Sequence, residues 1–167
     1  MKWVLIVLGV IAGLAIVLFV VGSLRPKDHI ATITEHVSAP DSTVWAVVTE
    51  REKMPEWFAD VKSVARIADV DGRPAFHESY GGGWTVTTVV RERVEGKKVV
   101  EEILPGGAFS GTWTYELAPD AGGTRLTITE RGHVENPMFR AFMMFGDNTR
   151  TMRRYVSALK KKLGVGP

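Results

Sequence analysis

The chain has 167 residues, of which 45% are hydrophobic and 24% charged, a composition that excludes disordered, collagen-like and coiled-coil proteins. Its formal net charge is only +2, which is too small to indicate nucleic-acid binding. The chain has no cysteine, so disulfides, thiolate nucleophiles and cysteine-ligated metals are excluded.

The first predicted element is an apolar helix over residues 3–22, which contain no charged side chain. About 20 helical residues, at about 1.5 Å each, match a bilayer hydrocarbon core of about 30 Å. We therefore predict that residues 1–28 form a single-pass membrane anchor and a short linker. A cleaved signal peptide, cut after Ser23, is the alternative, although its apolar stretch is normally only about 7–15 residues long.

The orientation of this anchor is weakly determined by its flanking charges. Lys2 precedes the apolar run, and Arg25 and Lys27 follow it, so the positive-inside rule is nearly balanced. The very short amino-terminal tail is typical of a signal-anchor, which favours an extracytoplasmic domain. The sequence leaves the topology open.

The soluble domain is predicted to begin with a strand and two short helices. Residues 29–37 alternate β-branched with polar side chains, which is typical of a strand. Asp41 or Ser42 can cap a helix that continues to Thr49, and a second short helix is predicted around residues 54–58.

The rest of the domain reads as an antiparallel meander followed by a helix. Gly- and Pro-containing turns separate six strands, predicted at residues 61–68, 76–80, 84–93, 98–104, 109–117 and 124–133. From Pro137 to Leu163 apolar residues recur every three or four positions, which predicts one long amphipathic helix that ends at Gly164. The predicted fold is α+β, with a curved antiparallel sheet of six to seven strands wrapped around a long C-terminal helix.

Two stretches of the domain resemble the SRPBCC superfamily, which comprises START-like, Bet v 1-like and polyketide-cyclase-type proteins with the helix-grip fold. HVSAPDSTVWAVVTEREKMPEWFADV, residues 36–61, resembles the family's first strand and helix pair. GTWTYELAPDAGGTRLTITERGHVENPMFRAF, residues 111–142, resembles its last two strands and the start of its C-terminal helix. The resemblance covers residues 30–163 and identifies residues 29–164 as a ligand-binding domain. It implies a deep apolar cavity that carries a lipid, sterol, quinone or polyketide intermediate, and in a minority of members it implies cyclisation or dehydration.

Polar side chains on inward strand faces are the candidates for ligand binding. Leu126, Ile128 and Glu130 share one face of their strand, so Glu130 points inward if the two apolar residues do. A carboxylate there needs a partner, and its pKa would tend to rise. Ordinary core packing or a strand-end ion pair is the alternative. The predicted cavity residues are Glu130, Tyr115, Trp113, Glu78, Tyr80, Trp84, Phe142 and Met143.

The sequence contains no recognisable catalytic or metal-binding motif. Its four histidines, His29, His36, His77 and His133, lack metal-ligand spacing, so no metal or cofactor is expected. We therefore predict a membrane-tethered protein that binds a hydrophobic small molecule, such as a lipid, a quinone or a polyketide-like compound, and that does not bind nucleic acid.

Two other functions remain open from the sequence. One is a cyclase or dehydratase, which would need a buried acid–base pair such as Glu130 with Tyr115 or His36. The other is a protein-interaction module in membrane stress or quality control, which would have a fully packed interior.

Overall fold

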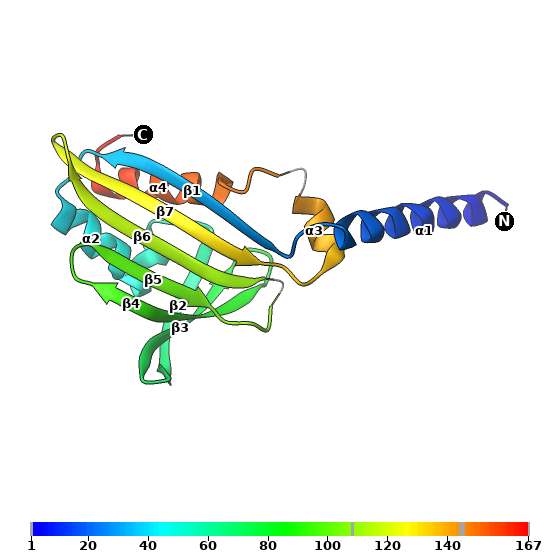
Figure 1. Cartoon of the computed structure of the whole chain (residues 1–167), viewed down its shortest axis with the longest axis horizontal. Helices are drawn as coiled ribbons and strands as arrows, with labels where there is room; N and C mark the ends of the chain where they lie inside the picture. Colours follow the sequence, from blue (N-terminus) through cyan, green and yellow to red (C-terminus); the bar gives the residue numbers. More distant parts are fainter. Residues whose placement is uncertain (1, 108, 144–145, 167) are drawn as a thin grey trace.

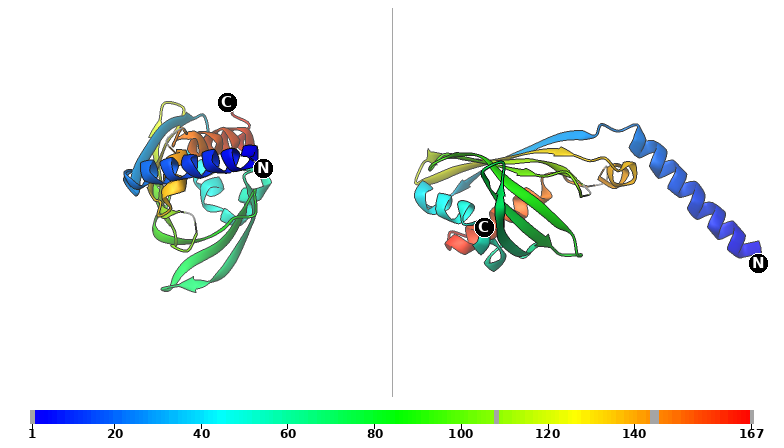
Figure 2. Two further views of the ribbon diagram at one scale, coloured as in Figure 1. Left: turned by 90° about the vertical axis from the view of Figure 1, so that its right-hand side faces the viewer. Right: turned by 90° about the horizontal axis from the view of Figure 1, so that it is seen from below.

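The computed structural model describes residues 2–107, 109–143 and 146–166. A curved sheet holds helices on its concave side, and one long helix projects from the end of the domain (Figure 1). The right-hand view of Figure 2 shows that the sheet bends around these helices, so that the two layers enclose the interior.

Seven strands form one antiparallel sheet in the order β1-β7-β6-β5-β4-β3-β2. The chain therefore returns at its last strand to pair with its first, while every other neighbouring pair is consecutive in sequence. The strands are β1 Asp28–Val37, β2 Val61–Val70, β3 Arg73–Tyr80, β4 Thr85–Val94, β5 Lys98–Ile103, β6 Ser110–Asp120 and β7 Gly123–His133. The predicted curved antiparallel sheet is confirmed, and each strand lies within a few residues of its expected place.

The helical insertion after β1 consists of α2, Asp41–Thr49, and a 3₁₀ helix η1, Arg51–Glu56. Helix α2 buries Val44, Trp45 and Val48 against the sheet. The second helix begins earlier than the predicted 54–58 and is of the tighter 3₁₀ kind, as short connecting helices often are.

Helix α4, Arg150–Leu163, lies in the concavity of the sheet. Its side chains of Met152, Tyr155 and Leu159 are almost completely buried, because they lie on the apolar face that the three-to-four-residue spacing predicts. The helix ends at Gly164, whose φ of 70° is left-handed, as expected for a C-terminal glycine.

The prediction of one continuous helix from Pro137 to Leu163 is wrong. The structure has two helices, α3 Pro137–Met143 and α4 Arg150–Leu163. Before α4, the Asp147 carboxylate accepts hydrogen bonds from the backbone N–H and the hydroxyl of Thr149, at 2.8 and 2.6 Å. Side-chain bonds of this kind compete with helix formation, so they favour a turn at this point.

Helix α1, Lys2–Ser23, is long and apolar enough to cross a membrane, a property that a signal sequence shares. Its last turn packs against α3 through Arg140, whose Nε donates to the Gly22 carbonyl at 2.8 Å. The Nη1 of Arg140 also donates to the carbonyls of Val134 and Glu135, at 2.8 and 2.7 Å. Because Arg140 satisfies a carbonyl at the end of α1, it joins that end to the domain.

Candidate functional site

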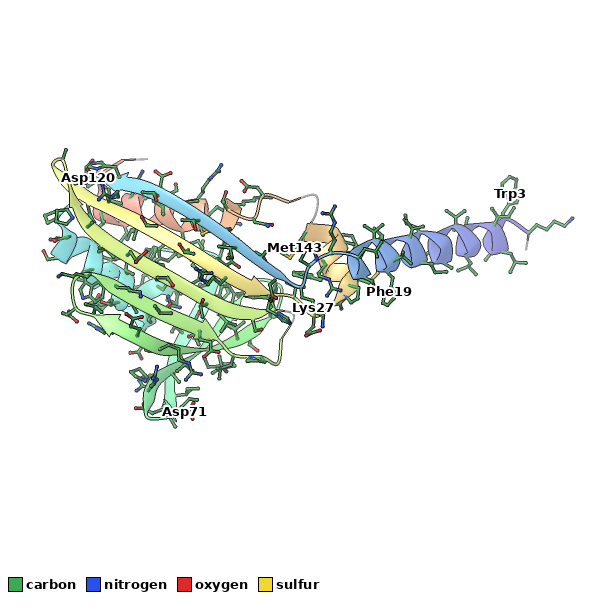
Figure 3. The ribbon with its side chains drawn as sticks, viewed as in Figure 1. Trp3, Phe19, Lys27, Asp71, Asp120 and Met143 are labelled. Carbon is green, nitrogen blue, oxygen red and sulfur yellow. The ribbon has the colours of Figure 1, made fainter. Side chains whose placement is uncertain are left out.

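A cavity of about 370 Å³ lies between the sheet and helices η1, α3 and α4. This volume is in the range of small-molecule sites. Much of its wall is apolar or aromatic, and that part is formed by Met54, Phe58, Trp84, Ile103, Phe109, Trp113, Val134, Phe139 and Met143. Figure 3 shows Met143 at the end of the domain from which α1 projects, so one part of the cavity wall adjoins that helix.

A buried ion cluster forms the polar part of the cavity wall. Arg51, from η1, lies between two strand carboxylates, with its Nη2 2.5 Å from Glu78 Oε1 and its Nη1 2.9 Å from Glu101 Oε2. Thr88 and Tyr80 donate hydrogen bonds to the two oxygens of Glu78, each at 2.7 Å. Arg51, Glu78 and Glu101 are 6%, 0% and 4% exposed, so water does not screen their interactions appreciably.

Burial and charge pairing act in opposite directions on these groups. Burial favours the neutral forms, but the two carboxylates hold the pKa of Arg51 well above its usual value. Burial likewise works to raise the pKa of Glu78, yet Arg51 and the hydrogen bonds from Thr88 and Tyr80 lower it below the usual value. Arg51 and Glu78 are therefore a charged pair at neutral pH.

Glu101 is the titratable member of the cluster. Burial raises the pKa of Glu101 to about 7. The attraction of Arg51 opposes this rise, but Arg51 is also paired with Glu78, and the negative charge of Glu78 raises the pKa of Glu101 further. A pKa of about 7 leaves this carboxyl group partly protonated at neutral pH.

An aromatic group adjoins the ion cluster on the side of α4. The rings of Trp57, Phe58 and Tyr115 pack around Tyr155, with centroids 5.1 to 5.5 Å away. Within residues 2–107, 109–143 and 146–166, the hydroxyl of Tyr155 and the Nε of Arg51 are the buried side-chain polar atoms without a hydrogen-bond partner. Both residues line the cavity.

A second polar group, Glu130 with His29, lines the cavity on the β1–β7 side. Glu130 Oε1 lies 3.5 Å from His29 Nε2, and both side chains are largely buried. Burial raises the pKa of Glu130, and the contacts with His29 and Trp113 oppose this rise. Glu130 is opposite Trp113 in the β6–β7 register, and Trp113 is opposite Glu101 in the β5–β6 register. Trp113 therefore lies between the two carboxylates.

The structure brings together seven of the eight residues that the sequence singled out. Glu130, Tyr115, Trp113, Glu78, Tyr80, Trp84 and Met143 all line the cavity. Phe142 does not; its side chain is on the outside of α3 and is 59% exposed. His36 was considered as an acid–base partner of Glu130. It lies at the surface instead, with its Nδ1 3.2 Å from Asp120 Oδ2.

Sequence reasoning missed Arg51, Glu101, Thr88, Tyr155 and the role of His29. The signal for Glu101 was present, because Val99, Glu101 and Ile103 share the buried face of β5. Arg51 carried no such signal. It lies in a short 3₁₀ helix between α2 and β2, and its burial depends on how that helix meets the sheet.

A family model described as polyketide cyclase/dehydrase and lipid transport matches residues 28–164, which extend from β1 to the end of α4. No curated protein is similar enough to the chain to count as a relative.

Solved structures share this fold at low sequence identity. A START superfamily protein from Mycobacterium smegmatis is 20% identical, covering 81% of this chain and 97% of its own, with a TM-score of 0.67. The Zhui aromatase/cyclase from Streptomyces sp. R1128 is 14% identical, covering 82% and 94%, with a TM-score of 0.68. A norcoclaurine synthase from Thalictrum is 13% identical, covering 81% and 94%, with a TM-score of 0.63. At such identities the likeness establishes the helix-grip fold alone.

Proposed function

This chain belongs to the polyketide cyclase/dehydrase and lipid transport family, and we propose that it is a membrane-tethered protein that binds a hydrophobic small molecule in its internal cavity. The observation that carries the proposal is the cavity of about 370 Å³, whose mostly apolar wall converges on a few polar side chains. A lipid, quinone or polyketide-like ligand would gain about 25 cal/mol for each Å² of apolar surface removed from water.

The position of the cavity supports the membrane tether. Helix α3 contributes Phe139 and Met143 to the cavity wall, and the same helix holds the end of α1 through Arg140 and Gly22. If α1 spans a bilayer, this part of the cavity lies close to the membrane surface, which is the reservoir of hydrophobic ligands. Exchange of a ligand with the bilayer would then need only a short path.

Mass spectrometry of small molecules that copurify with the full chain tests the binding proposal. Ile103→Trp places a larger side chain in the cavity wall, whereas Ile67→Trp makes the same change at a position that is 37% exposed on β2. We expect a hydrophobic compound with the wild type and with Ile67→Trp, and its depletion with Ile103→Trp. Equal recovery with all three proteins would contradict binding in the cavity.

The tether is tested separately by fractionating cells that express the chain. We expect the full-length chain to stay in the membrane pellet after alkaline extraction, because an apolar helix of this length is held by the bilayer. A shortened, soluble product lacking residues 2–23 would instead identify α1 as a cleaved signal peptide.

An enzymatic role is the second candidate, and Glu101 is the observation that favours it. A carboxyl group with a pKa of about 7 beside Arg51 is suited to general acid–base chemistry at neutral pH. The test is turnover: a polyketide-like compound recovered in altered form, with the change abolished by Glu101→Gln or Glu130→Gln, would support catalysis. The third alternative, a protein-interaction module, was expected to have a fully packed interior. The cavity of about 370 Å³ does not agree with that expectation.

A further inference from the structure

We propose that helix α3 lies in the headgroup region of the lipid bilayer, with Phe142 directed toward the acyl chains. The interaction surface is the outer face of α3, Pro137–Met143, and its partner is the bilayer itself. This inference rests on the proposed membrane tether, because it takes α1 to span the membrane. It adds a second segment of the chain that contacts lipid.

The first argument is the depth at which α1 holds α3. Helix α1, Lys2–Ser23, has 22 residues and is therefore about 33 Å long, close to the roughly 30 Å of the hydrocarbon core. Gly22, at the end of this helix, is buried against α3, and a Cβ there would lie 1.8 Å from the Pro137 carbonyl oxygen. The headgroup region adds only about 5–8 Å on each side of the core. A helix that packs directly against Gly22 is therefore held in that region, because lifting it into water would pull the apolar end of α1 out of the bilayer.

The second argument is the exposed surface of α3. Its sequence, PMFRAFM, contains one charged residue, Arg140, and that side chain is buried, at 7% exposed. Phe142 is 59% exposed, and the other residues of α3 that are not buried are proline, methionine or phenylalanine. A surface helix in water normally presents polar side chains on its outer face. The outer face of α3 presents apolar ones, which suits contact with lipid.

The backbone at the end of α1 supports the same placement. The last carbonyls of a helix lack partners within the helix and need water or other donors. Here the Ser23 hydroxyl donates to the Phe19 carbonyl at 2.8 Å. Arg140 Nε, from α3, donates to the Gly22 carbonyl at 2.8 Å. A helix end whose carbonyls are satisfied by the protein tolerates the water-poor boundary of the hydrocarbon core.

The absence of cysteine from the sequence allows single labels to report the depth of chosen positions. Phe142→Cys carries an environment-sensitive fluorophore on the full chain in phosphatidylcholine vesicles. Val10→Cys, at an exposed position near the middle of α1, is the reference inside the bilayer. Ile67→Cys, at an exposed position on β2, is the control outside it. Ile67 precedes the β2–β3 turn at Asp71, which Figure 3 shows directed away from α1.

Lipids that carry a spin label near the headgroup or near the chain end quench a fluorophore at the matching depth. We expect the Phe142→Cys label to emit at shorter wavelength than the Ile67→Cys label. It should lose more emission to the spin label near the headgroup than to the one near the chain end. The Val10→Cys label should show the reverse order, and the Ile67→Cys label should lose little emission to either lipid.

The outcomes separate this inference from the tether. Quenching of the Val10→Cys label without quenching of the Phe142→Cys label would overturn the inference and leave the tether intact. Emission at shorter wavelength from Phe142→Cys that neither lipid quenches would overturn it as well, because a protein surface such as a second copy of the chain would then cover α3. No quenching of the Val10→Cys label would overturn both the tether and the inference.

Discussion

Removing the charge of Arg51 is the most direct way to examine the buried cluster. The substitution Arg51→Met keeps an unbranched side chain of similar length but leaves Glu78 and Glu101 without the cation between them. Breaking a buried ion pair from one side lowers the free energy of unfolding by about 3–5 kcal/mol, because a charge remains buried without compensation. We expect a loss in that range at pH 8.

The loss is measured by urea unfolding of the full chain in detergent, followed by tryptophan fluorescence. Arg154→Met is the control, because Arg154 forms an ion pair with Asp60 and its side chain is 55% exposed. Exposed pairs of this kind contribute about 1 kcal/mol or less. The two variants therefore compare the same chemical change in a buried and an exposed setting.

The dependence on pH gives a second check of the same reasoning. Without Arg51, burial raises the pKa of Glu78 and Glu101 in the folded state above their unfolded values. A carboxyl group whose pKa is higher in the folded than in the unfolded state stabilises the fold at low pH. This contribution to the free energy of unfolding is lost as the pH rises through the folded pKa. The decrease in the free energy of unfolding that Arg51→Met causes should therefore be smaller at pH 5 than at pH 8. A loss below about 1 kcal/mol, or one that does not change with pH, would refute the view that Arg51 compensates buried negative charge.

Two further predictions concern Glu101 and the α1–α3 contact. Because the pKa of Glu101 is raised from 4.5 to about 7, the wild-type free energy of unfolding should fall by up to about 3 kcal/mol from pH 5 to pH 8. Glu101→Gln should lack this fall; an unchanged slope in urea titrations across that range would contradict the assignment. At Gly22, an added Cβ would lie 1.8 Å from the Pro137 carbonyl oxygen, whereas at Gly13 it would meet nothing within 4 Å. Gly22→Val should therefore separate α1 from α3 and accelerate proteolysis of the segment between α1 and β1, and Gly13→Val should not. Equal proteolysis of the two variants would mean that the contact is dispensable.

The sheet and the inward face of each strand could be predicted from the sequence, because strand alternation depends on local spacing. The spacing of Leu126, Ile128 and Glu130 placed Glu130 on the inner face of β7, where it lines the cavity. The same rule applied to β5 would have placed Glu101 inside. Its neighbour Glu102 lies on the opposite, less buried face of β5, so only the alternation separates the two carboxylates.

The pairing of Arg51 with two strands could not be predicted, because it is a long-range arrangement. Glu78 and Glu101 are on different strands, β3 and β5, and β4 lies between them in the sheet. Only the curvature of the sheet and the position of η1 place the guanidinium between both carboxylates. Local sequence patterns indicate that a side chain points inward, but they do not identify its partner across the core.

The break between α3 and α4 links the cavity to the end of the domain from which α1 projects. A continuous helix over residues 137–163 would be about 40 Å long and straight, so it could not fill the concave sheet and also turn to meet α1. The turn at Asp147 allows both contacts, and Figure 2 shows α3 beside the end of α1 while α4 lies under the sheet. Phe139 and Met143 on α3 line the cavity, and Arg140 on the same helix binds the Gly22 carbonyl. Any movement of α3 must therefore either break the Arg140 contact or carry the end of α1 with it, which couples this part of the cavity wall to helix α1.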